Sequence, residues 1–563
     1  MAYQEQMPEL IENNRDPMPS SALGVPIFRA VWLASMSSNF GGLVQAVGAS
    51  WLMTTLTDSP QYVALVQAST AMPIMLFSLL AGAIADNMDR RRVMICAQFF
   101  MLIVSAVLAV CAWYGVLTPW VLIGFTFLIG CGTSLNNPAW QASVGDMVPR
   151  HLLPGAVALN SMGFNIARSV GPAIGGAIVA AGGSAAAFAT NAVSYIALLA
   201  VLLRWQPDVK PRTLPRERIG VAVSAGFRYV AMSPNIRAVL FRSCLFGIAA
   251  AALPALLPVV ANILITGGPL VYGALLGSFG VGAVAGAISI GRLRRIYSTE
   301  WIVRAASVAV LAGTAITGAS ESLLLTMPAL MLAGAGWVLA LSTFNVSVQM
   351  AAPRWVVARA LSFYQMVTFG GMAFGSWFFG YVATHQNISI ALFAAAASMA
   401  VFLPLGLIRP LQQIENVDLD PLNRWSEPET AVPVESRSGP VVITVEHRIA
   451  EKDILSFLHV MNERRRICRR DGFMGWTLLR DLANPQMWIE RFHVPTWLDY
   501  LRGAQRRTKA DAENYEQVQK LHIDGAPAIV HRMVERQPGS MPTGQQPGGR
   551  ELADPLTDIT RAS

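Results

Sequence analysis

Charge is scarce in this sequence. Only 13% of its 563 residues are Asp, Glu, Lys or Arg, whereas an ordinary soluble domain carries about 25%. Because 53% of the residues are hydrophobic, the composition argues against an ordinary soluble protein and, over most of the chain, against disorder. Lysine is almost missing. The net charge of +8 is not gathered on one soluble segment, so we expect no nucleic-acid partner.

Paired cysteines, nucleotide-binding loops and leader-like features are also lacking. The 5 Cys have no short paired spacing, so we expect neither a metal site nor a disulfide framework. No Gly-x-x-x-x-Gly-Lys-Ser/Thr segment is present, and we therefore expect no ATP hydrolysis and no cofactor. Residues 1–26 contain acidic residues and no short apolar core, which argues against a signal peptide.

Long apolar runs fill residues 27–408. A membrane helix needs roughly 20 mostly apolar residues, and charged or Gly/Pro clusters divide these runs into predicted spans. The twelve predicted spans are 28–55, 61–84, 93–115, 119–142, 155–181, 184–203, 238–263, 270–290, 301–318, 323–347, 359–383 and 388–408.

Arginine marks every second loop between these spans. No Arg or Lys occurs in loops 57–60, 115–119, 181–184, 266–269, 320–322 and 384–387. The other loops all carry Arg. By the positive-inside rule, the Arg-bearing loops and both termini are predicted to be cytoplasmic, in a multi-pass protein of the cell (inner) membrane surrounded by lipid bilayer.

The longest Arg-bearing loop divides the spans six and six, which predicts two six-helix halves related as a parallel repeat. The predicted fold is an α-helical polytopic membrane protein with an appended small α+β domain. Its segments are a cytoplasmic N-terminal segment 1–26, an N-terminal half 27–204, a central loop 205–235, a C-terminal half 236–408, a linker 409–438, the small cytoplasmic domain 439–537 and a disordered tail 538–563.

The loop after the second span contains Gly82, Asp86, Arg90 and Arg91. A glycine lets two helices approach closely, and a carboxylate at a helix end can pair with an Arg or with a helix N-terminus of the other half. The segment resembles the loop 2–3 signature of the major facilitator superfamily, although that family often has Gly where Asp89 stands. The resemblance implies a gate on the cytoplasmic side; a basic loop that only fixes topology is the alternative. A counterpart at 286–295 lacks the acidic residue.

Span 5 carries the small-residue motif Gly171, Pro172, Gly175 and Gly176. It is similar to the end of a motif associated with exporters of that superfamily, with Ala158 and Ala167 where the family has Gly. Generic small-residue packing is the alternative explanation. The stretches Ser38-Asn39-Phe-Gly and Asn160-Ser161, together with the appended C-terminal region, resemble the transmembrane secretion effector branch, which includes enterobactin-type siderophore exporters.

Arg168 is the strongest candidate for a substrate contact. It lies about 20 Å along span 5, where a charged residue costs at least ~2.5 kcal/mol unless it faces a wet cavity or a partner. Ser161 and Asn165 share its helical face. The other predicted cavity residues are Asn39, Asn137, Asn345 and Gln365. A structural role for Arg168, and helix–helix hydrogen bonds for the neutral residues, are the alternatives.

No Asp or Glu falls in the middle of a predicted span. A proton-coupled exporter needs a group that gains and loses a proton along its path. The sequence therefore leaves proton or ion coupling open and does not indicate where the energy enters.

After the linker, the pattern changes to that of a small α+β domain. Residues 441–448, 475–481, 487–494 and 528–534 read as strands, and residues 451–468, 496–502 and 507–521 as helices. This order predicts a ferredoxin-like sandwich and resembles the small dimeric domains of antibiotic-biosynthesis monooxygenases, which implies self-association. The five His of the region are scattered along the sequence, and we expect no catalysis.

The leading prediction is a secondary-active exporter, not an enzyme. Its expected substrates are small amphipathic organic molecules of siderophore, drug or metabolite type, moved by alternating access. An importer on the same fold, and a membrane-held enzyme or a sensor acting through the C-terminal domain, are the alternatives.

Overall fold

The computed structural model describes residues 21–149, 152–206, 219–353, 355–404, 406, 410–411, 428, 430–506, 508–523 and 527–535. Most of the predicted N-terminal segment, most of the predicted linker and the predicted tail 538–563 lie outside these residues. The chain divides into two compact units. The first comprises Met1–Arg216, Ala238–Asn345 and Ser362–Gln412, and the second comprises Glu217–Arg237, Val346–Leu361 and Gln413–Ser563.

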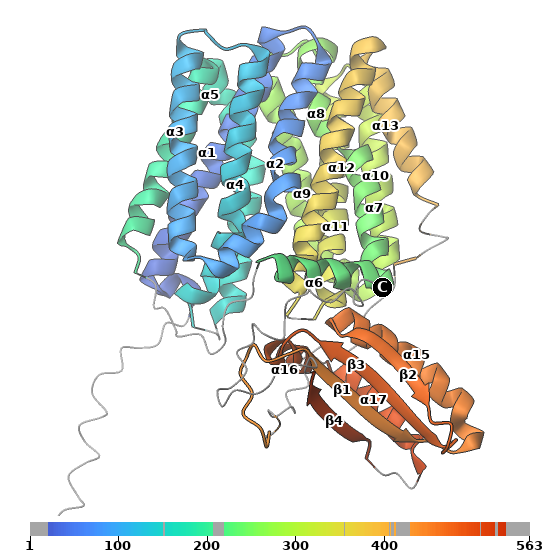
Figure 1. Ribbon diagram of the computed structural model, residues 1–563. Helices are drawn as coiled ribbons and strands as arrows, with labels where there is room; N and C mark the ends of the chain where they lie inside the picture. The colour runs from blue at the N-terminus through green and yellow to red at the C-terminus, as the bar shows by residue number, and fades with distance from the viewer. Residues whose placement is uncertain are drawn as a thin grey trace, which may run out of the picture. The chain divides into compact units, whose positions relative to one another are not determined.

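The first unit is a bundle of long helices (Figure 1). In the first part of the chain, the short η1 (Ala22–Gly24) precedes the long helices. These are α1 (Pro26–Leu56), α2 (Pro60–Asn87), α3 (Arg90–Trp113), α4 (Pro119–Met147) and α5 (Leu153–Arg204). After the central loop follow α7 (Pro234–Ala250), α8 (Ala252–Val259), η3 (Val260–Leu264), α9 (Pro269–Ile296), α10 (Thr299–Ala319), α11 (Leu323–Ala351), α12 (Val357–His385) and α13 (Ile388–Phe402).

Proline and glycine set several helix boundaries. Proline occupies the first turn of α1, α2, α4, α5 and α9, where its missing N–H costs no hydrogen bond. Gly183 interrupts α5 with a φ of 72°, a conformation that glycine adopts without a steric penalty. This interruption separates the predicted spans 155–181 and 184–203.

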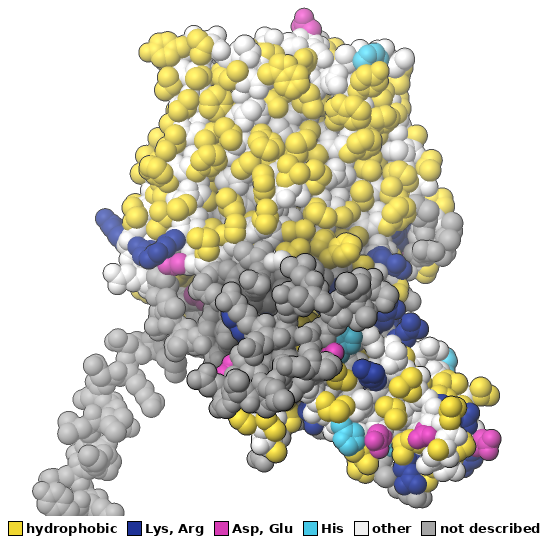
Figure 2. Space-filling model, viewed as in Figure 1, with side chains coloured by type: hydrophobic (Ala, Val, Ile, Leu, Met, Phe, Trp, Pro, Cys, Tyr) yellow, Lys and Arg dark blue, Asp and Glu magenta, His cyan; other side chains and the backbone are white. Residues whose placement is uncertain are grey.

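Nine helices of the described part of the chain are long and apolar enough to cross a membrane. The number is smaller than twelve because α5 counts as one helix despite its interruption, α13 has only 15 residues, and α1 is not among the nine. The twelve-span count stays a prediction. Figure 2 shows hydrophobic side chains over the sides of this unit and Arg side chains toward one end.

The two ends of the bundle differ in charge, as the loops predict. We call the end formed by loops 57–60, 115–119, 181–184, 266–269, 320–322 and 384–387 the Arg-free end. We call the opposite end, where Arg90–Arg92 begin α3 and Arg292–Arg295 end α9, the Arg-rich end. Helix α5 enters from the Arg-rich end at Leu153 and reaches the Arg-free end near Gly183.

The second unit contains a four-stranded antiparallel sheet in the order β2-β3-β1-β4. Central strand β1 pairs Val441 with Val494 of β3 and with Val534 of β4. The helices and strands of the second unit are α6 (Ile219–Met232), β1 (Val441–Arg448), η4 (Glu451–Asp453), α15 (Ile454–Asp471), β2 (Met474–Arg480), β3 (Met487–Val494), α16 (Trp497–Gln505), α17 (Lys509–Lys520) and β4 (Ile529–Val534).

The predicted strands and helices of residues 441–534 all have counterparts within three residues at each end. Helix α15 begins later than predicted because the short η4 precedes it, and it ends at Asp471, where the following Gly472 has a φ of 105°. One element differs from the sequence prediction: the predicted central loop 205–235 contains helix α6. Prolines and arginines dominate the first part of that loop and obscure the apolar, helix-compatible segment that follows.

Candidate functional site

Arg168 lies against aromatic rings from the other half of the bundle. Its guanidinium carbon is 5.7 Å from the ring centroid of Phe279 in α9 and 6.0 Å from that of Trp337 in α11. The two rings contact each other edge to face at 5.8 Å. A cation over aromatic faces gains about 0.5–2 kcal/mol. The predicted charged residue of α5 therefore sits where the two halves meet.

The aromatic surface under Arg168 continues into the second half. Phe246 of α7 lies 6.3 Å from Trp337 and 6.0 Å from Phe344 of α11, measured between ring centroids. Phe246, Phe279, Trp337 and Phe344 are all buried. Among the acidic side chains that the structure describes, none forms an ion pair with Arg168. The guanidinium is thus stabilised by ring faces, and no described carboxylate pairs with it.

The remaining predicted cavity residues lie on several helices. Asn39 of α1, Asn345 of α11 and Gln365 of α12 are half-buried, and Asn137 of α4 is exposed. Ser161 and Asn165 lie in α5, but their side chains are outside what the structure describes. That they share a face with Arg168 follows from helical spacing alone.

Some polar residues of the spans serve helix packing instead. Gln45 of α1 accepts hydrogen bonds from Ser105 of α3, at 2.9 Å, and from Asn191 of α5. Asn191 also donates to Tyr195 at 3.1 Å. These four side chains are buried, and a buried polar group is stable only when it is hydrogen-bonded. The network therefore joins three helices of the N-terminal half.

The small-residue motif of α5 allows two close helix contacts. A side-chain carbon at Gly171 would lie 3.1 Å from Leu43 Cβ, and one at Gly175 would lie 3.0 Å from Val44 Cα, both in α1. A side-chain carbon at Gly176 would lie 2.7 Å from the carbonyl oxygen of Pro269 and 2.9 Å from Gly273 Cα, both in α9. The motif thus joins α5 to α1 within its half and to α9 across the halves.

Pro172 and Ser169 contribute to the same contact between halves. The carbonyl oxygen of Pro172 lies 2.9 Å from where a side chain of Gly273 would begin. One turn deeper, Ser169 Oγ donates a hydrogen bond of 2.9 Å to the carbonyl oxygen of Gly280 in α9. Helices α5 and α9 are therefore in backbone contact from the Arg-free end to the level of Arg168.

Two further contacts join the halves at the Arg-free end. The rings of Trp51 in α1 and Tyr272 in α9 are stacked, with 6.3 Å between centroids. Thr384 at the end of α12 accepts a hydrogen bond of 3.0 Å from the backbone N–H of Gln61 in α2. Together with the α5–α9 contact, these interactions hold the two halves together at this end.

The predicted gate motif lies at the Arg-rich end. Gly82 of α2 faces α12, where a side-chain carbon would lie 3.2 Å from Ser362 Oγ, and nearby Ser78 Oγ donates to the Ser362 carbonyl at 3.2 Å. Asp86 is in the last turn of α2, but its side chain is outside the described ones. The motif's glycine therefore marks a close approach between the halves.

The two arginines of the motif bind to the N-terminal half. Arg90 Nη1 forms an ion pair with Asp146 of α4 at 2.8 Å and donates to the Ala142 carbonyl at 3.0 Å. Arg91 donates to the carbonyl oxygens of Leu202 and Leu203 in α5, at 2.8 and 2.7 Å. The sequence does not assign this role to Asp146; an acidic side chain four residues after the predicted span 119–142, beside the Arg-bearing loop, is the available signal.

The C-terminal half repeats part of this arrangement. Arg294, in the predicted counterpart 286–295, donates to the carbonyl oxygen of Ser342 in α11 at 3.0 Å, as Arg90 does to Ala142 in α4. Gly286 packs against the backbone of Ala335, also in α11. The arginine contact thus recurs in the two halves, whereas the glycine contacts differ, because Gly82 packs against the other half and Gly286 packs within its own.

A buried ion cluster in the C-terminal half also escaped the sequence analysis. Glu300, in the first turn of α10, pairs with Arg242 of α7 and, at 2.8 Å, with Arg304. Its carboxylate also accepts the backbone N–H of Leu411 at 3.0 Å. The cluster fastens the segment after α13 to two helices at the Arg-rich end.

Comparison with known proteins gives a family and a fold. The model of a family described as transmembrane secretion effector matches residues 18–538. A staphyloferrin A transporter of Staphylococcus aureus is 27% identical over 246 residues, which cover 43% of this chain and 62% of that protein. An enterobactin exporter of Salmonella typhimurium is 28% identical over 218 residues, 38% of this chain and 51% of that protein.

The matched stretches thus span between about half and two thirds of the length of these two relatives. Among solved structures, a crystal structure of the POT family transporter PepTSo is similar with a TM-score of 0.56 and 12% identity. The matched region covers 68% of this chain and 97% of the PepTSo chain. At this identity the likeness shows the fold alone.

Proposed function

The chain belongs to the transmembrane secretion effector branch of the major facilitator superfamily, and we propose that it is a secondary-active exporter of small amphipathic organic molecules. The family and the relatives named above are transport proteins, not enzymes. The observation that carries the proposal is Arg168, a charged side chain deep in α5 that contacts Phe279 and Trp337 of the other half.

The chemistry around Arg168 supports the substrate class. A guanidinium offers several N–H donors in a planar fork suited to carboxylate or other oxygen acceptors, and the neighbouring rings offer apolar surface. Asn137 is exposed on α4, and an amide group facing lipid would be costly, so it supports a wet path. A siderophore-like, drug-like or metabolite-like molecule with oxygen acceptors and an apolar body fits these groups.

Alternating access would use the contacts between the halves. The contacts Trp51–Tyr272, Gly176–Gly273 and Gln61–Thr384 support a state closed at the Arg-free end. In the opposite state these contacts would separate, and Asp86 would help to hold the Arg-rich end shut, where Gly82 and Ser78 already lie close to Ser362 of α12. Helices packed through small residues can slide or rock because no side chains interlock.

We also infer the orientation of the chain in the membrane. The positive-inside rule supports Arg-bearing loops and both termini in the cytoplasm. Cysteines introduced in loop 57–60, in a background without native cysteine, should be labelled from outside, and cysteines replacing Arg90–Arg92 should not.

We further infer that residues 439–537 form a ferredoxin-like sandwich, which the sheet order β2-β3-β1-β4 supports. Exposed apolar side chains on its edge strand β4 support self-association.

A deletion strain tests the proposed function. Strains lacking the protein, or producing wild type or Arg168→Gln, would be screened for secreted siderophores and for sensitivity to antibiotics and amphipathic metabolites. We expect one class of compound to be retained, or to become toxic, in the deletion strain and to be restored only by wild type. No difference across all three classes would contradict the proposal. Reduced uptake in place of reduced secretion would indicate an importer.

A further inference from the structure

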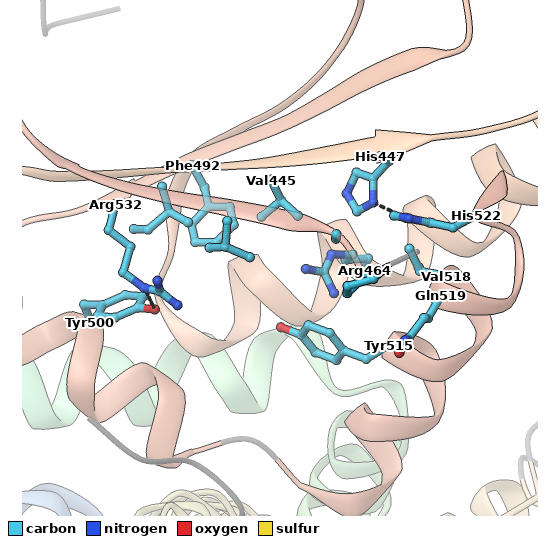
Figure 3. Close-up of a pocket in the computed structure, with 14 residues that line it drawn as sticks. Val445, His447, Arg464, Phe492, Tyr500, Tyr515, Val518, Gln519, His522 and Arg532 are labelled. Carbon is cyan, nitrogen blue, oxygen red and sulfur yellow. Dashed lines mark hydrogen bonds between the residues drawn. The ribbon is translucent and has the colours of Figure 1, made fainter. Parts of the chain in front are cut away.

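The second unit contains a cavity that the transport path does not involve. Its volume is about 240 Å³, and it lies between the sheet and helices α15, α16 and α17 (Figure 3). An engineered protein cavity of about 150 Å³ binds benzene. The present cavity can therefore hold a molecule of on the order of ten non-hydrogen atoms.

One side of the cavity is apolar. Ile443 and Val445 of β1 and Phe492 of β3 are buried and face it, and Val530 of β4 lines its exposed edge. These side chains present aliphatic and aromatic surface without hydrogen-bonding groups. They suit the apolar body of an organic ligand.

The opposite side carries a guanidinium with an unused donor. Arg464 Nε of α15 donates to both carboxylate oxygens of Glu490, at 2.9 and 2.7 Å. Its Nη1 is buried and has no hydrogen-bond partner among the described residues. Leaving such a donor unpaired costs about 1–3 kcal/mol or more. In Figure 3 the guanidinium points into the space toward Tyr500 and Arg532.

The charge of the lining favours an anion. Burial alone would raise the pKa of Glu490, but the Arg464 guanidinium and a hydrogen bond from Trp476 contribute to lowering it to about 2. Glu490 is therefore ionised and neutralises Arg464. Arg532, whose Nε donates to Tyr500 at 2.7 Å, adds a second positive charge at the mouth. With Glu490 and Arg464 paired, the lining therefore carries one net positive charge, at the exposed Arg532.

Two histidines and a tyrosine complete the polar side. His447 Nδ1 and His522 Nε2 lie 2.9 Å apart and share a hydrogen bond, although 75 residues separate them in the sequence. The Arg464 guanidinium carbon lies 4.0 Å from the ring centroid of Tyr515, which fixes the side chain in place. The polar groups are thus pre-positioned around the unused Nη1 donor.

We propose that this cavity is a binding site for a small organic monocarboxylate with an apolar or aromatic body. The carboxylate accepts hydrogen bonds from Arg464 Nη1, and the apolar body lies on Ile443, Val445 and Phe492. The site is separate from the proposed transport path around Arg168 and does not rest on the export proposal.

Benzoate is the probe, because it combines one carboxylate with one ring of suitable size. Titration calorimetry on the purified full-length protein in nanodiscs should show saturable binding of one benzoate per chain. Benzyl alcohol, which has the ring without the charge, should bind at least tenfold more weakly. Equal affinity for both compounds would overturn the proposed ligand class.

Matched variants locate the site. Val530→Phe fills the cavity from an exposed strand position, whereas Ile529→Phe adds the same bulk to the other face of β4. We expect Val530→Phe to abolish benzoate binding and Ile529→Phe to leave it unchanged. Retained binding in Val530→Phe, or no saturable binding by wild type, would overturn the proposal.

Arg464→Lys tests the donor itself. It keeps the charge beside Glu490 and removes Nη1, so benzoate affinity should fall about 10- to 100-fold, as expected for the loss of one charge-assisted hydrogen bond. Undiminished affinity in a folded Arg464→Lys protein would contradict the assignment. If that variant does not fold, the pair at positions 529 and 530 decides the question.

Discussion

Arg470 in α15 lies over the ring of Tyr229 in α6, with 5.4 Å between the guanidinium carbon and the ring centroid. The Tyr229 hydroxyl in turn donates to the carbonyl oxygen of Ala351, at the end of α11, at 3.2 Å. Residues from the predicted central loop, from the predicted C-terminal half and from the C-terminal domain are therefore joined within the second unit. No local sequence pattern indicates this arrangement.

Removing the ring of Tyr229 should weaken the association of α6 with α15. We expect Tyr229→Ala and Arg470→Gln to be coupled by about 0.5–2 kcal/mol in a double-mutant cycle of thermal stability. Hydrogen exchange of residues 219–232 should be faster in Tyr229→Ala. Tyr229→Phe keeps the ring and serves as the control. Additive effects of the two substitutions would show that the contact contributes no stability.

Asp471 should make stability depend on pH. Burial raises the pKa of its carboxyl to about 6, although Arg470 beside it favours the charged form. The native state therefore binds a proton between pH 7 and 5, whereas the unfolded chain, with a pKa near 3.9, does not. Wild type should gain about 1 kcal/mol relative to Asp471→Asn as the pH falls from 7 to 5.

Thermal unfolding of both proteins at several pH values measures this difference. The exposed residue Glu451 offers the control substitution Glu451→Gln, which should follow wild type. A constant difference between wild type and Asp471→Asn from pH 7 to 5 would contradict the raised pKa.

The periodic parts of the fold are readable from the sequence, and the contacts between distant segments are not. Strand β1 has the predicted bounds Val441–Arg448 because apolar side chains recur along it with a period of two. The depth of Arg168 follows from counting residues in an apolar run. Its partners Phe279 and Trp337 lie more than 100 residues away, in runs where an aromatic residue carries no special signal.

Buried polar groups show the same limit. Gln45 and Arg168 both stand out as polar residues in apolar spans. Gln45 binds Ser105 and Asn191 and serves packing, whereas Arg168 lies on ring faces between the halves. The charge of Arg168 sets it apart in the sequence, but only the fold shows that Gln45 has polar packing partners and that Arg168 lies on aromatic rings.

The α5–α9 contact makes Gly176 sensitive to any side chain. Gly176→Ala places a carbon 2.7 Å from the Pro269 carbonyl oxygen, so the backbones must move apart. We expect transport to fall at least several-fold while the protein remains in the membrane. Gly124→Ala in α4, where no atom lies within 4 Å of the added carbon, is the matched control. Normal transport by Gly176→Ala would show that this contact is not part of the transport cycle.

Asp86 should control closure of the Arg-rich end. Asp86→Asn removes the charge at the end of α2 and is expected to impair transport without loss of folded protein. Asp89→Asn is the comparison, because Asp89 caps α3 through the backbone N–H of Arg91 at 3.0 Å and pairs with Arg92 at 3.5 Å, both within the start of α3. If the two variants transported equally well, the motif would serve topology alone.

Direction-resolved transport in membrane vesicles tests the central claim most directly. Energised inverted vesicles would be given the compound that the deletion screen identifies, with wild type, Arg168→Gln, Arg168→Lys or the exposed control Arg29→Gln. An exporter that uses Arg168 should accumulate the compound in inverted vesicles, and both Arg168 variants should lose about 10- to 100-fold in affinity while Arg29→Gln does not. Accumulation in right-side-out vesicles instead, or wild-type transport by folded Arg168→Gln, would contradict the account.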